Sequence, residues 1–394
     1  MDRRTFLKAG ATATAAFTTL GSSIWRSAYA EVVPGEGPYG PLGAADANGL
    51  RLPAGFSSRI IARSGELVPG TQYPWHVFPD GGATFATPDG GWIYVSNSEV
   101  PVAGGAGAVR FNAQGTIVDA YRILSGTTSN CAGGATPWGT WLSCEEYENG
   151  LTWECDPTGK ELARPLPALG TFSHEAVAVD PTDDRTAYLT EDSSEGRFYR
   201  FTADKPGDLS SGVLEVMVVD DPALIEYGGP VTWEPVPNPN PVAGLPTATR
   251  RQVPASTRFR GGEGCWLDIR NGKRIVYFTT KGDIRVWAYH VDAETPYVEV
   301  FYDFRAQEGS PLNAVDNVIV AASGDVIVAE DGGNMELCLI SREGTVSPLV
   351  RVGGQDNSEL CGPAFDPSGT RLYFSSQRGY RIGVTYEVTG PFRS

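Results

Sequence analysis

Short segments in which apolar and polar residues alternate recur along most of the chain. They include "GWIYVSNSEV", "TAYLTED", "RIVYFTTKGDIRVWAYHV" and "TRLYFSSQRG", and they end at Gly, Asp, Asn or Pro. Alternation with a period of two, bounded by turn residues, is typical of β-strands of roughly four to nine residues. Few windows carry the longer period of an amphipathic helix. The pattern therefore predicts an all-β protein.

The strand pattern also repeats at a higher level. Segments such as "VAVDPTDDRTAYLTEDSSEGRFYRF" and "WLDIRNGKRIVYFTTKGDIRVWAYH" each contain a turn, a strand, an acidic or glycine-rich exit and a second strand. This is the inner half of a propeller blade, and about 360 residues at roughly 50 to 60 per blade predict six blades. "GVTYEVTG" near the end can pair with "SSRIIARSG" near the start and close the ring, which removes unpaired edges. An array of two-sheet sandwiches is the alternative.

The residues after the leader form one domain, 31–394, in this interpretation. A proline-rich segment at about 222–256 lacks strand alternation. We expect it to be a long insertion over one face of the ring, not a linker between domains.

The first 30 residues have the features of an export signal. "DRRTFLKAG" places Arg3 and Arg4 before Phe-Leu-Lys, a weakly apolar run follows, and "SAYA" ends at Ala30. Paired arginines before such a run indicate the twin-arginine route. The sequence predicts a twin-arginine signal peptide at 1–30 and a periplasmic or extracellular protein, with the export machinery as a partner. No other apolar stretch is long enough to span a bilayer, so we expect no stable membrane anchor.

The chain is acidic, with a formal net charge of −16. Cleavage after Ala30 leaves 27 lysines and arginines against 46 acidic residues, a charge of −19. Such a surface argues against nucleic acid as a partner. We expect a monomer that acts on a small molecule.

Six cysteines and three histidines limit the chemistry of a metal site. No two cysteines form a C-x-x-C pair, so a zinc ribbon is excluded, and three histidines are too few for a polyhistidine site. Cys144 with Cys155, and Cys338 with Cys361, are plausible disulfides by sequence distance in an exported protein, although spacing does not fix connectivity.

Polar residues at strand ends provide the candidate chemistry. Strands nearest a propeller axis end at one rim, so residues far apart in sequence converge there. The candidates are Asn97, Glu99, Cys131, Glu145, Glu146, His174, Glu175, Glu191, Asp192, Glu263, Asp316, Asn317, Glu330 and Asp331.

The types of these side chains indicate which metals they suit. Carboxylates and amide oxygens suit calcium. A thiolate among carboxylates suits a softer or redox metal, iron above all. In "NCAGGATPWGTWLSCEE", a tight turn at Gly133, Gly134 and Pro137 would aim the Cys131 side chain at such a metal. The alternative is that Cys131 is a buried or disulfide-bonded cysteine.

Several of these segments resemble the PhoX-type alkaline phosphatases. The resemblance rests on "NCAGGATPWGTWLSCEE", "FSHEAVAVDP", "YLTEDSSEGRFYRF", "VDNVIVAASGDVIVAEDGG" and "CGPAFDPSGTRLYFSSQRG", and it covers nearly all of the chain after the leader. It implies an exported phosphomonoester hydrolase with a small phosphomonoester substrate. It also implies a six-bladed propeller with a central site of two oxo-bridged ferric ions and about three calcium ions.

The resemblance also assigns roles to residues. Cys131 would be the thiolate ligand of iron, and Glu175 and Glu263 would be carboxylates at the iron pair that are shared with calcium. The calcium ligands would be Glu99, Glu145 or Glu146, Asp192, Asp316 and Asp331. His174 would point away from the site, because it precedes Glu175 in a strand.

One departure from the family pattern concerns the arginine expected to bind phosphate. The family commonly carries it two residues before the carboxylate that matches Glu263, whereas here Arg260 lies three residues before it. Arg260 is the candidate catalytic residue, although bidentate contact of a guanidinium is geometrically demanding. A calcium-dependent propeller lactonase or esterase, and a non-catalytic calcium-binding propeller, are the alternative functions.

Overall fold

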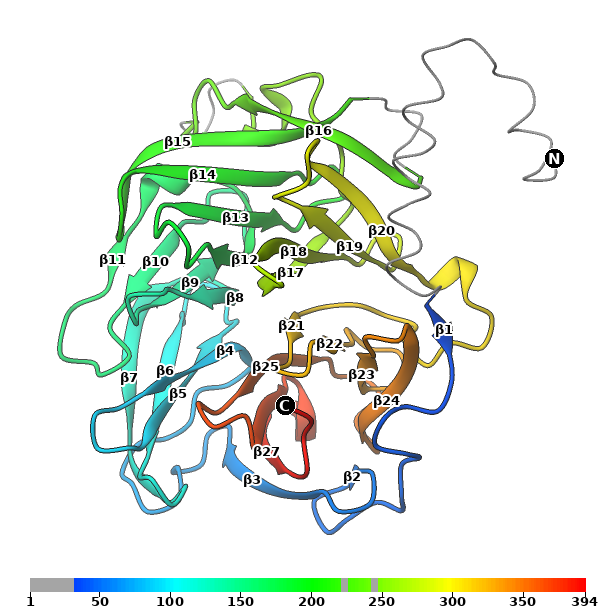
Figure 1. Cartoon of the computed structure of the whole chain (residues 1–394). Helices are drawn as coiled ribbons and strands as arrows, with labels where there is room; N and C mark the ends of the chain where they lie inside the picture. The colour runs from blue at the N-terminus through cyan, green and yellow to red at the C-terminus, as the bar shows by residue number, and fades with distance from the viewer. Residues whose placement is uncertain (1–31, 221–225, 242–246) are drawn as a thin grey trace.

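Sheets arranged around a common centre make up the molecule (Figure 1). The computed structural model describes residues 32–220, 226–241 and 247–394, and these ranges contain strands and short 3-10 turns but no α-helix. The predicted all-β class is confirmed, and the arrangement is propeller-like. The predicted leader, 1–30, lies outside the described residues.

Three sheets have four strands each, and in the first two the strands follow one another closely along the chain. The first consists of β4 (Pro79–Ala86), β5 (Trp92–Ser98), β6 (Gly104–Phe111) and β7 (Ile117–Thr127). The second consists of β8 (Asn130–Ala135), β9 (Trp141–Glu145), β10 (Thr152–Cys155) and β11 (Arg164–Pro165). The third joins β25 (Leu360–Phe365), β26 (Arg371–Ser376) and β27 (Val384–Thr389) to β3 (Ser57–Arg63).

The third sheet joins the two ends of the described chain. Strand β3 pairs antiparallel with β27 along its length, from Ser57 opposite Thr389 to Arg63 opposite Val384. This is the pairing that the sequence predicted for ring closure. It gives β27 an antiparallel neighbour on its otherwise open side.

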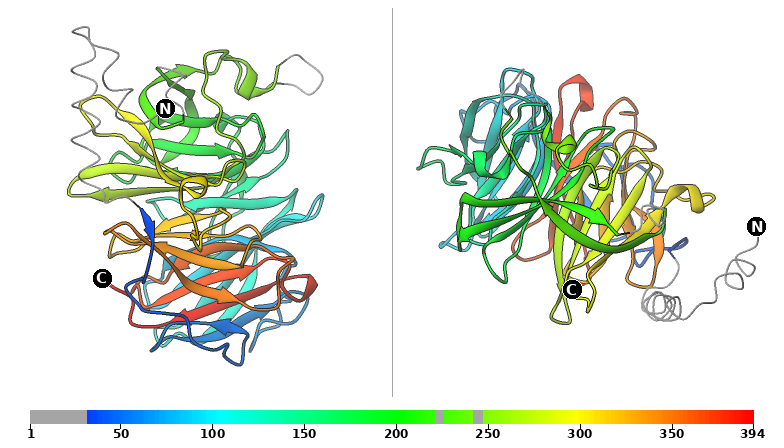
Figure 2. Two further views of the ribbon diagram at one scale, coloured as in Figure 1. Left: turned by 90° about the vertical axis from the view of Figure 1, so that its right-hand side faces the viewer. Right: turned by 90° about the horizontal axis from the view of Figure 1, so that it is seen from above.

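A six-stranded sheet contains strands from both ends of the described chain. Its members are β21 (Val318–Val320), β22 (Val326–Ala329), β23 (Glu336–Ile340), β24 (Thr345–Val352), β1 (Val33–Pro34) and β2 (Leu50–Arg51). The short β1 pairs parallel with β24, where it is seen as the blue strand in Figure 2. The N-terminal arm is therefore held along the outer edge of this sheet.

The largest sheet has nine strands in two consecutive runs. One run is β12 (His174–Val179), β13 (Thr186–Glu191), β14 (Phe198–Lys205), β15 (Asp208–Val219) and β16 (Gly228–Pro235). The other is β17 (Gly262–Arg270), β18 (Lys273–Thr280), β19 (Arg285–His290) and β20 (Tyr297–Asp303). Pairing of β16 with β20 joins the two runs at their outer edges.

Strand β16 corrects one sequence expectation. The proline-rich segment at about 222–256 was expected to contain no strand, but Gly228–Pro235 pairs with both β15 and β20. Its prolines are compatible with this because Pro230 and Pro235 lie near the two ends of the strand, where ladder hydrogen bonds can be omitted.

The remaining regular elements are single 3-10 turns. These are η1 (Pro167–Leu169), η3 (Thr249–Arg251), η4 (Phe304–Ala306) and η5 (Gly379–Arg381). The described ranges contain no helix that is long and apolar enough to cross a membrane.

Apolar side chains fill the spaces between neighbouring sheets. One core joins Leu142 of the second sheet to Leu189 and Tyr199 of the nine-stranded sheet. Within the nine-stranded sheet, the rings of Phe198 and Phe278 stack at 4.1 Å between the two runs. Sheets thus bury both faces against their neighbours, which explains why every residue of strands such as β5 and β23 is buried.

The first strand of each run lines the centre of the ring. Around the axis the order of contacts is β4, β8, β12, β17, β21, β25 and again β4. These strands approach one another at glycines: a Cβ on Gly134 would lie 1.8 Å from the Val177 carbonyl oxygen, and one on Gly264 would lie 2.4 Å from the Val318 nitrogen. Gly133 and Gly134 therefore lie within β8 and not in the turn that the sequence suggested, which occupies 136–140.

The close approach at Gly134 leads to a stability prediction. The Gly134→Ala variant is expected to lose about 1 to 3 kcal/mol in free energy of unfolding, because the added methyl group must displace the backbone of β12. Gly353→Ala is the matched control, since a Cβ there would meet its nearest heavy atom at 3.5 Å. Thermal unfolding of both variants tests this, and equal melting temperatures would contradict it.

All six cysteines are free thiols, so the plausible disulfides do not form. In the ladder between β9 and β10, Cys144 lies opposite Thr152 and Cys155 lies opposite Trp141, which places the two thiols at different ends of the ladder. Cys338 and Cys361 belong to different sheets. Disulfide geometry requires closely spaced and correctly directed Cβ atoms, which neither pair has.

Candidate metal centre

Acidic side chains and one thiol gather where the inner strands begin. Three groups have ligand atoms that all lie within 4.8 Å of one another. They are Cys131 with Glu146 and Glu175, Asp80 with Glu99 and Glu359, and Glu175 with Glu263 and Asp316. We call the set of Cys131, Glu146 and Glu175 the thiol group, and the set of Glu175, Glu263 and Asp316 the Glu263 group. Glu175 belongs to both, so the two groups share a ligand.

A repeated irregularity of the inner strands positions four of these residues. The register of pairing shifts after Pro79 in β4, after Asn130 in β8, after His174 in β12 and after Gly262 in β17. The residues that follow are Asp80, Cys131, Glu175 and Glu263. A register shift leaves an extra residue unpaired and redirects its side chain. The same backbone device thus places one candidate ligand from each of four strands.

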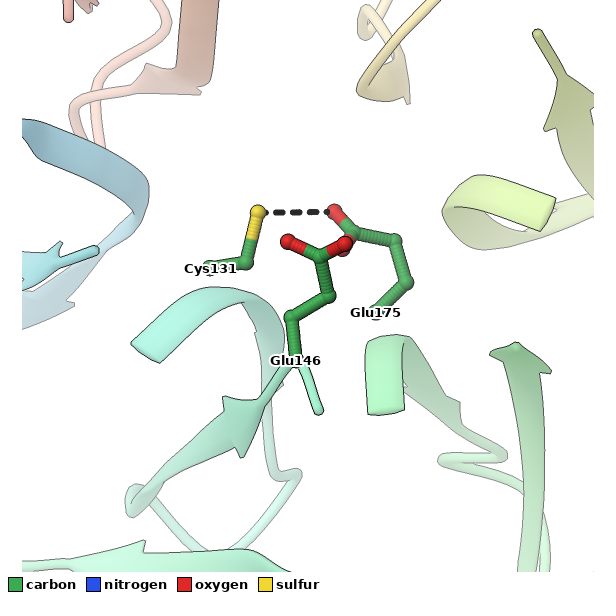
Figure 3. Close-up of side chains that lie close together, drawn as sticks. All are labelled: Cys131, Glu146 and Glu175. Carbon is green, nitrogen blue, oxygen red and sulfur yellow. Dashed lines mark hydrogen bonds between the residues drawn. The ribbon is translucent and has the colours of Figure 1, made fainter. Parts of the chain in front are cut away.

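The thiol group is shown in Figure 3, where the three side chains converge from separate segments. The Cys131 Sγ lies 3.3 Å from the Glu175 Oε1. Glu146 directly follows β9, and its carboxylate is directed toward Cys131 and Glu175. Among the described residues no cation contacts Cys131, and burial together with the charge of Asp80 raises the pKa of its thiol well above the usual range. A thiolate here requires a bound cation.

The carboxylates of the centre are buried without enough positive charge. Burial, reinforced by neighbouring carboxylates, raises the pKa of Asp80 to about 7 and that of Glu359 to about 8. Burial also raises the pKa of Glu146 to about 9, with a further contribution from Asp192. For Glu175 the pKa is raised well above the usual range by burial and then by the charge of Glu263. Buried carboxylates of this kind are stable only when cations or protons neutralise them.

Glu175 supplies the most direct indication of a missing partner. Its side chain is fully buried, and its Oε2 has no hydrogen-bond partner in the part of the chain that the structure describes. An unpaired buried carboxylate oxygen costs free energy, which coordination of a metal would recover. Oxygen donors with one thiol match calcium and iron, so these residues fit the metals that the sequence resemblance implies.

Two basic side chains already contact the acidic groups. The Lys281 Nζ lies 2.8 Å from Asp192 Oδ2 and 2.8 Å from Glu263 Oε1. The Arg378 guanidinium lies 2.9 Å from Glu359 and 3.6 Å from Glu99. Although burial opposes it, the charges of Glu263 and Asp192 raise the pKa of Lys281, so its ammonium group stays protonated.

The structure distinguishes between the adjacent candidates Glu145 and Glu146. Glu145 accepts hydrogen bonds from the Thr128 and Leu151 backbone nitrogens at 2.8 and 3.1 Å and from the Trp153 indole at 3.1 Å. Its oxygens are therefore engaged in holding the strand end, and Glu146 is the member of the thiol group. Successive residues at a strand end point in different directions, which explains the division.

The other predicted residues lie at varying distances from the centre. Asp192 contacts Glu146 and Lys281, and Asp331 contacts Glu359, although neither belongs to the three groups. His174 points away, where its ring stacks on Phe172 and its Nε2 lies 3.0 Å from the Gly170 carbonyl oxygen. The Arg260 side chain is exposed, and within the described ranges no contact joins its guanidinium to the three groups.

Sequence reasoning missed Asp80, Glu359, Lys281 and Arg378. A signal for Asp80 exists: Asp80, Cys131, Glu175 and Glu263 are each followed by Gly or Ala, because the next residue lies where inner strands pack closely. Lys281 directly follows β18, at the strand-end position that Glu99, Glu146 and Asp192 occupy after other strands. Arg378 lies two residues after the end of β26 and directly before η5. No residue type marks this position, so it was recognisable only from strand register.

An apolar cavity of about 550 Å³ opens along the inner strands beyond the acidic groups. Its lining includes Gly81, Ala132, Ala176 and Gly264, the residues that follow four of the candidate ligands, and none of the residues of the three groups. The inner strands thus present carboxylates at their beginning and small apolar residues farther along. A charged substrate would be recognised at the acidic and basic end.

These features define an all-β, propeller-like protein with a buried acidic centre of metal-binding character. The sequence between residues 93 and 379 matches the model of the family described as "Alkaline phosphatase PhoX", in the segments 93–162, 148–297 and 286–379. The chain belongs to this family of alkaline phosphatases, and it is a phosphatase of the PhoX type. The family is metal-dependent and secreted.

Solved structures agree with the fold. One similar structure is that of Pseudomonas fluorescens PhoX in complex with vanadate, described as a transition state analogue. Its TM-score is 0.70 at 15% sequence identity, over 92% of this chain and 98% of that chain. A protein of unknown function from Dyadobacter fermentans gives a TM-score of 0.52 at 11% identity, over 87% and 100% of the chains. No curated protein matches the sequence.

Proposed function

We propose that this phosphatase hydrolyses small phosphomonoesters with iron and calcium bound at the three acidic groups. The observation that carries the proposal is the fully buried Glu175, which belongs to two groups and has one oxygen without a partner among the described residues. We further propose that the ring has six blades, with the nine-stranded sheet counted as two blades because it consists of two runs joined at their outer edges.

The thiol group would hold iron, and the carboxylate groups would hold calcium or be shared between the metals. Cys131 is the soft ligand that favours iron, whereas Asp80, Glu99 and Glu359 offer only oxygen. When bound, these metals would polarise the phosphoryl oxygens and neutralise negative charge.

The chain's own cations would bind the phosphoryl group. Lys281 has a side chain that is 39% exposed, so its ammonium can reach solvent and substrate while it stays anchored to Asp192 and Glu263. Arg378, 44% exposed, stands on the other side of the acidic groups. Two protonated groups at the edge of the centre would orient a dianionic ester and offset its repulsion from the carboxylates.

Covalent catalysis by a serine is not favoured. Ser96 and His76 lie 3.3 Å apart, but both are buried, and the Ser96 hydroxyl also donates to the Asp80 carbonyl oxygen at 3.2 Å. Burial lowers the pKa of His76 to about 3. A nucleophile must reach its substrate, and this pair instead packs between sheets.

The Lys281→Met variant tests the role of the ammonium group. We expect KM for an aryl phosphate to rise about tenfold, since a charge-assisted hydrogen bond to the substrate is lost. Arg260→Ala is the comparison, because the sequence singled out that arginine. A KM that rises in Arg260→Ala and stays unchanged in Lys281→Met would contradict the assignment and restore Arg260.

The function itself is tested by phosphate release from an aryl phosphate by purified holoprotein, before and after metal removal by a chelator. Turnover that disappears with the metals and returns with iron and calcium supports the proposal. Lactone hydrolysis without phosphate release would favour the lactonase alternative, and calcium binding without turnover would favour a binding protein. Export through the twin-arginine route to the periplasm or the exterior, as a monomer, is part of the proposal and rests on the sequence of 1–30.

A further inference from the structure

Three buried polar side chains occupy one equivalent position in different runs of strands, each of which is one blade of the proposed ring. In the ladders β4–β5, β12–β13 and β17–β18, one residue of the second strand stands opposite the register shift of the first. In β5 this residue is Asn97, between Ser96 and Ser98. In β13 it is Thr190, and in β18 it is Thr279. All three side chains are buried.

Each of the three donates a hydrogen bond to the next run of strands around the ring. The Asn97 Nδ2 lies 2.9 Å from the Cys131 carbonyl oxygen and 2.7 Å from the Ala132 carbonyl oxygen. The Thr190 hydroxyl donates to the Glu263 carbonyl oxygen. The Thr279 hydroxyl donates to the Asp316 carbonyl oxygen at 2.5 Å. The acceptor is in every case the backbone of a candidate metal ligand.

Asn97 is fixed by further contacts. Its Oδ1 accepts from the Trp141 indole at 2.9 Å and from the Ser143 hydroxyl at 2.8 Å. Two donated and two accepted bonds satisfy the full capacity of an amide side chain. A buried amide saturated in this way has one orientation, so the backbone of Cys131 is held in one position.

Thr190 links two register shifts. Its hydroxyl accepts from the Ala176 backbone nitrogen at 3.0 Å and donates to the Glu263 carbonyl oxygen. Ala176 directly follows Glu175. One hydroxyl therefore satisfies backbone groups beside two candidate ligands that lie in different inner strands, where the irregular pairing leaves those groups without ladder partners.

We infer that Asn97, Thr190 and Thr279 are positioning residues of the metal centre, each fixing the backbone of a ligand residue in the neighbouring run of strands. The inference rests on the proposed metal centre. A metal site needs ligand atoms held in one geometry, and groups that orient the ligands strongly influence affinity. The hydrogen bonds set that geometry through the main chain of Cys131, Glu263 and Asp316.

The second sheet supplies a natural control. Cys144 occupies the equivalent position in β9, opposite the register shift of β8. Its thiol lies 3.7 Å from the Thr152 hydroxyl of its own sheet, and no hydrogen bond joins it to Glu175 within the described residues. Replacement of Cys144 changes packing at the same position without removing a bond to a ligand residue.

The experiment compares Thr190→Val, Thr279→Val and Cys144→Ala in the full-length holoprotein. Valine keeps the shape of threonine and removes the hydroxyl. Metal retained per protein is measured after dialysis against a graded series of chelator concentrations, and the melting temperature is recorded with and without metal. We expect both valine variants to bind metal about 10- to 100-fold more weakly. Thr190→Ser, which keeps the hydroxyl, should restore wild-type retention, and Cys144→Ala should also behave as wild type.

The outcomes separate this inference from the metal centre itself. A wild-type protein that retains no iron or calcium overturns the metal centre, and the positioning roles with it. A wild type that retains metal, with valine variants indistinguishable from Cys144→Ala, overturns the positioning roles alone. A fall in melting temperature that is equal with and without metal, at unchanged metal retention, shows that these side chains stabilise the fold only, and it also overturns the inference.

Discussion

The Glu175→Gln variant is expected to lose phosphatase activity by roughly a thousandfold, the several kcal/mol that a metal contributes to charge stabilisation. Glu175 belongs to both the thiol group and the Glu263 group, so its replacement weakens two sites at once. A neutral amide also offers one donor where an acceptor is needed. Steady-state kinetics with an aryl phosphate, together with elemental analysis of bound metal, measures both effects.

The metal-free state of the same variant gives a second readout with the opposite sign. Without metal, Glu175 is a fully buried carboxylate surrounded by Glu263, Glu146 and Asp316. Burial and these neighbours penalise the ionised form of Glu175, and glutamine removes this cost, so the melting temperature of metal-free protein is expected to rise above that of metal-free wild type. The metal-induced rise in melting temperature should shrink, since less metal binds.

Glu145→Gln is the matched control, because Glu145 is a buried glutamate on the adjacent strand whose oxygens accept protein hydrogen bonds. We expect it to lower the melting temperature in both states and to leave metal content unchanged. Wild-type activity and metal content in Glu175→Gln would refute the central role of Glu175.

The Cys131→Ala variant is expected to lose iron while it retains calcium. The carboxylates Asp80, Glu99 and Glu359 form a group without the thiol and suit calcium, whereas Cys131 is the soft donor of the centre. Activity should fall by roughly a hundredfold to a thousandfold, since a metal that stabilises phosphoryl charge is absent. Elemental analysis for both metals and the visible absorption of a thiolate–iron bond provide the measurement.

Cys155→Ala serves as the comparison for this loss, because Cys155 is equally buried in β10 of the same sheet and belongs to none of the three groups. It should retain both metals and the visible absorption. Loss of calcium and iron together in Cys131→Ala would show that the groups do not bind metal independently. Retention of iron would remove Cys131 from the ligand set.

The three hydrogen bonds donated by Asn97, Thr190 and Thr279 connect neighbouring runs of strands at this centre. If the ligands were fixed only by their own strands, each sheet could shift without effect on its neighbours. Bonds from Asn97, Thr190 and Thr279 make the geometry of each site depend on two adjacent runs of strands. Closure of the ring by β3 and β27 then becomes relevant to metal binding, because it fixes the positions of all the sheets together.

The sequence by itself determined the strand content, the ring closure and most of the candidate ligands. Period-two alternation reports which residues face a core, and this local property is readable without tertiary contacts. Cys131, Glu175, Glu263 and Asp316 were identified because polar residues at the ends of the strands nearest a propeller axis converge at one rim, and because a thiol among carboxylates favours iron. The family resemblance covered the same residues.

Only the tertiary structure showed which of two adjacent residues faces the centre and which residues of different sheets lie together. Glu145 and Glu146 are identical in type, and only the direction of each side chain at the end of β9 separates a structural carboxylate from a member of the thiol group. The two plausible disulfides do not form, because strand register, and not sequence distance, sets the separation of the thiols. The structure also places Asp80, Lys281 and Arg378 at the centre, because the register shifts and strand ends of the different sheets lie close together around the ring. Register between sheets depends on contacts far apart in sequence, which no local pattern encodes.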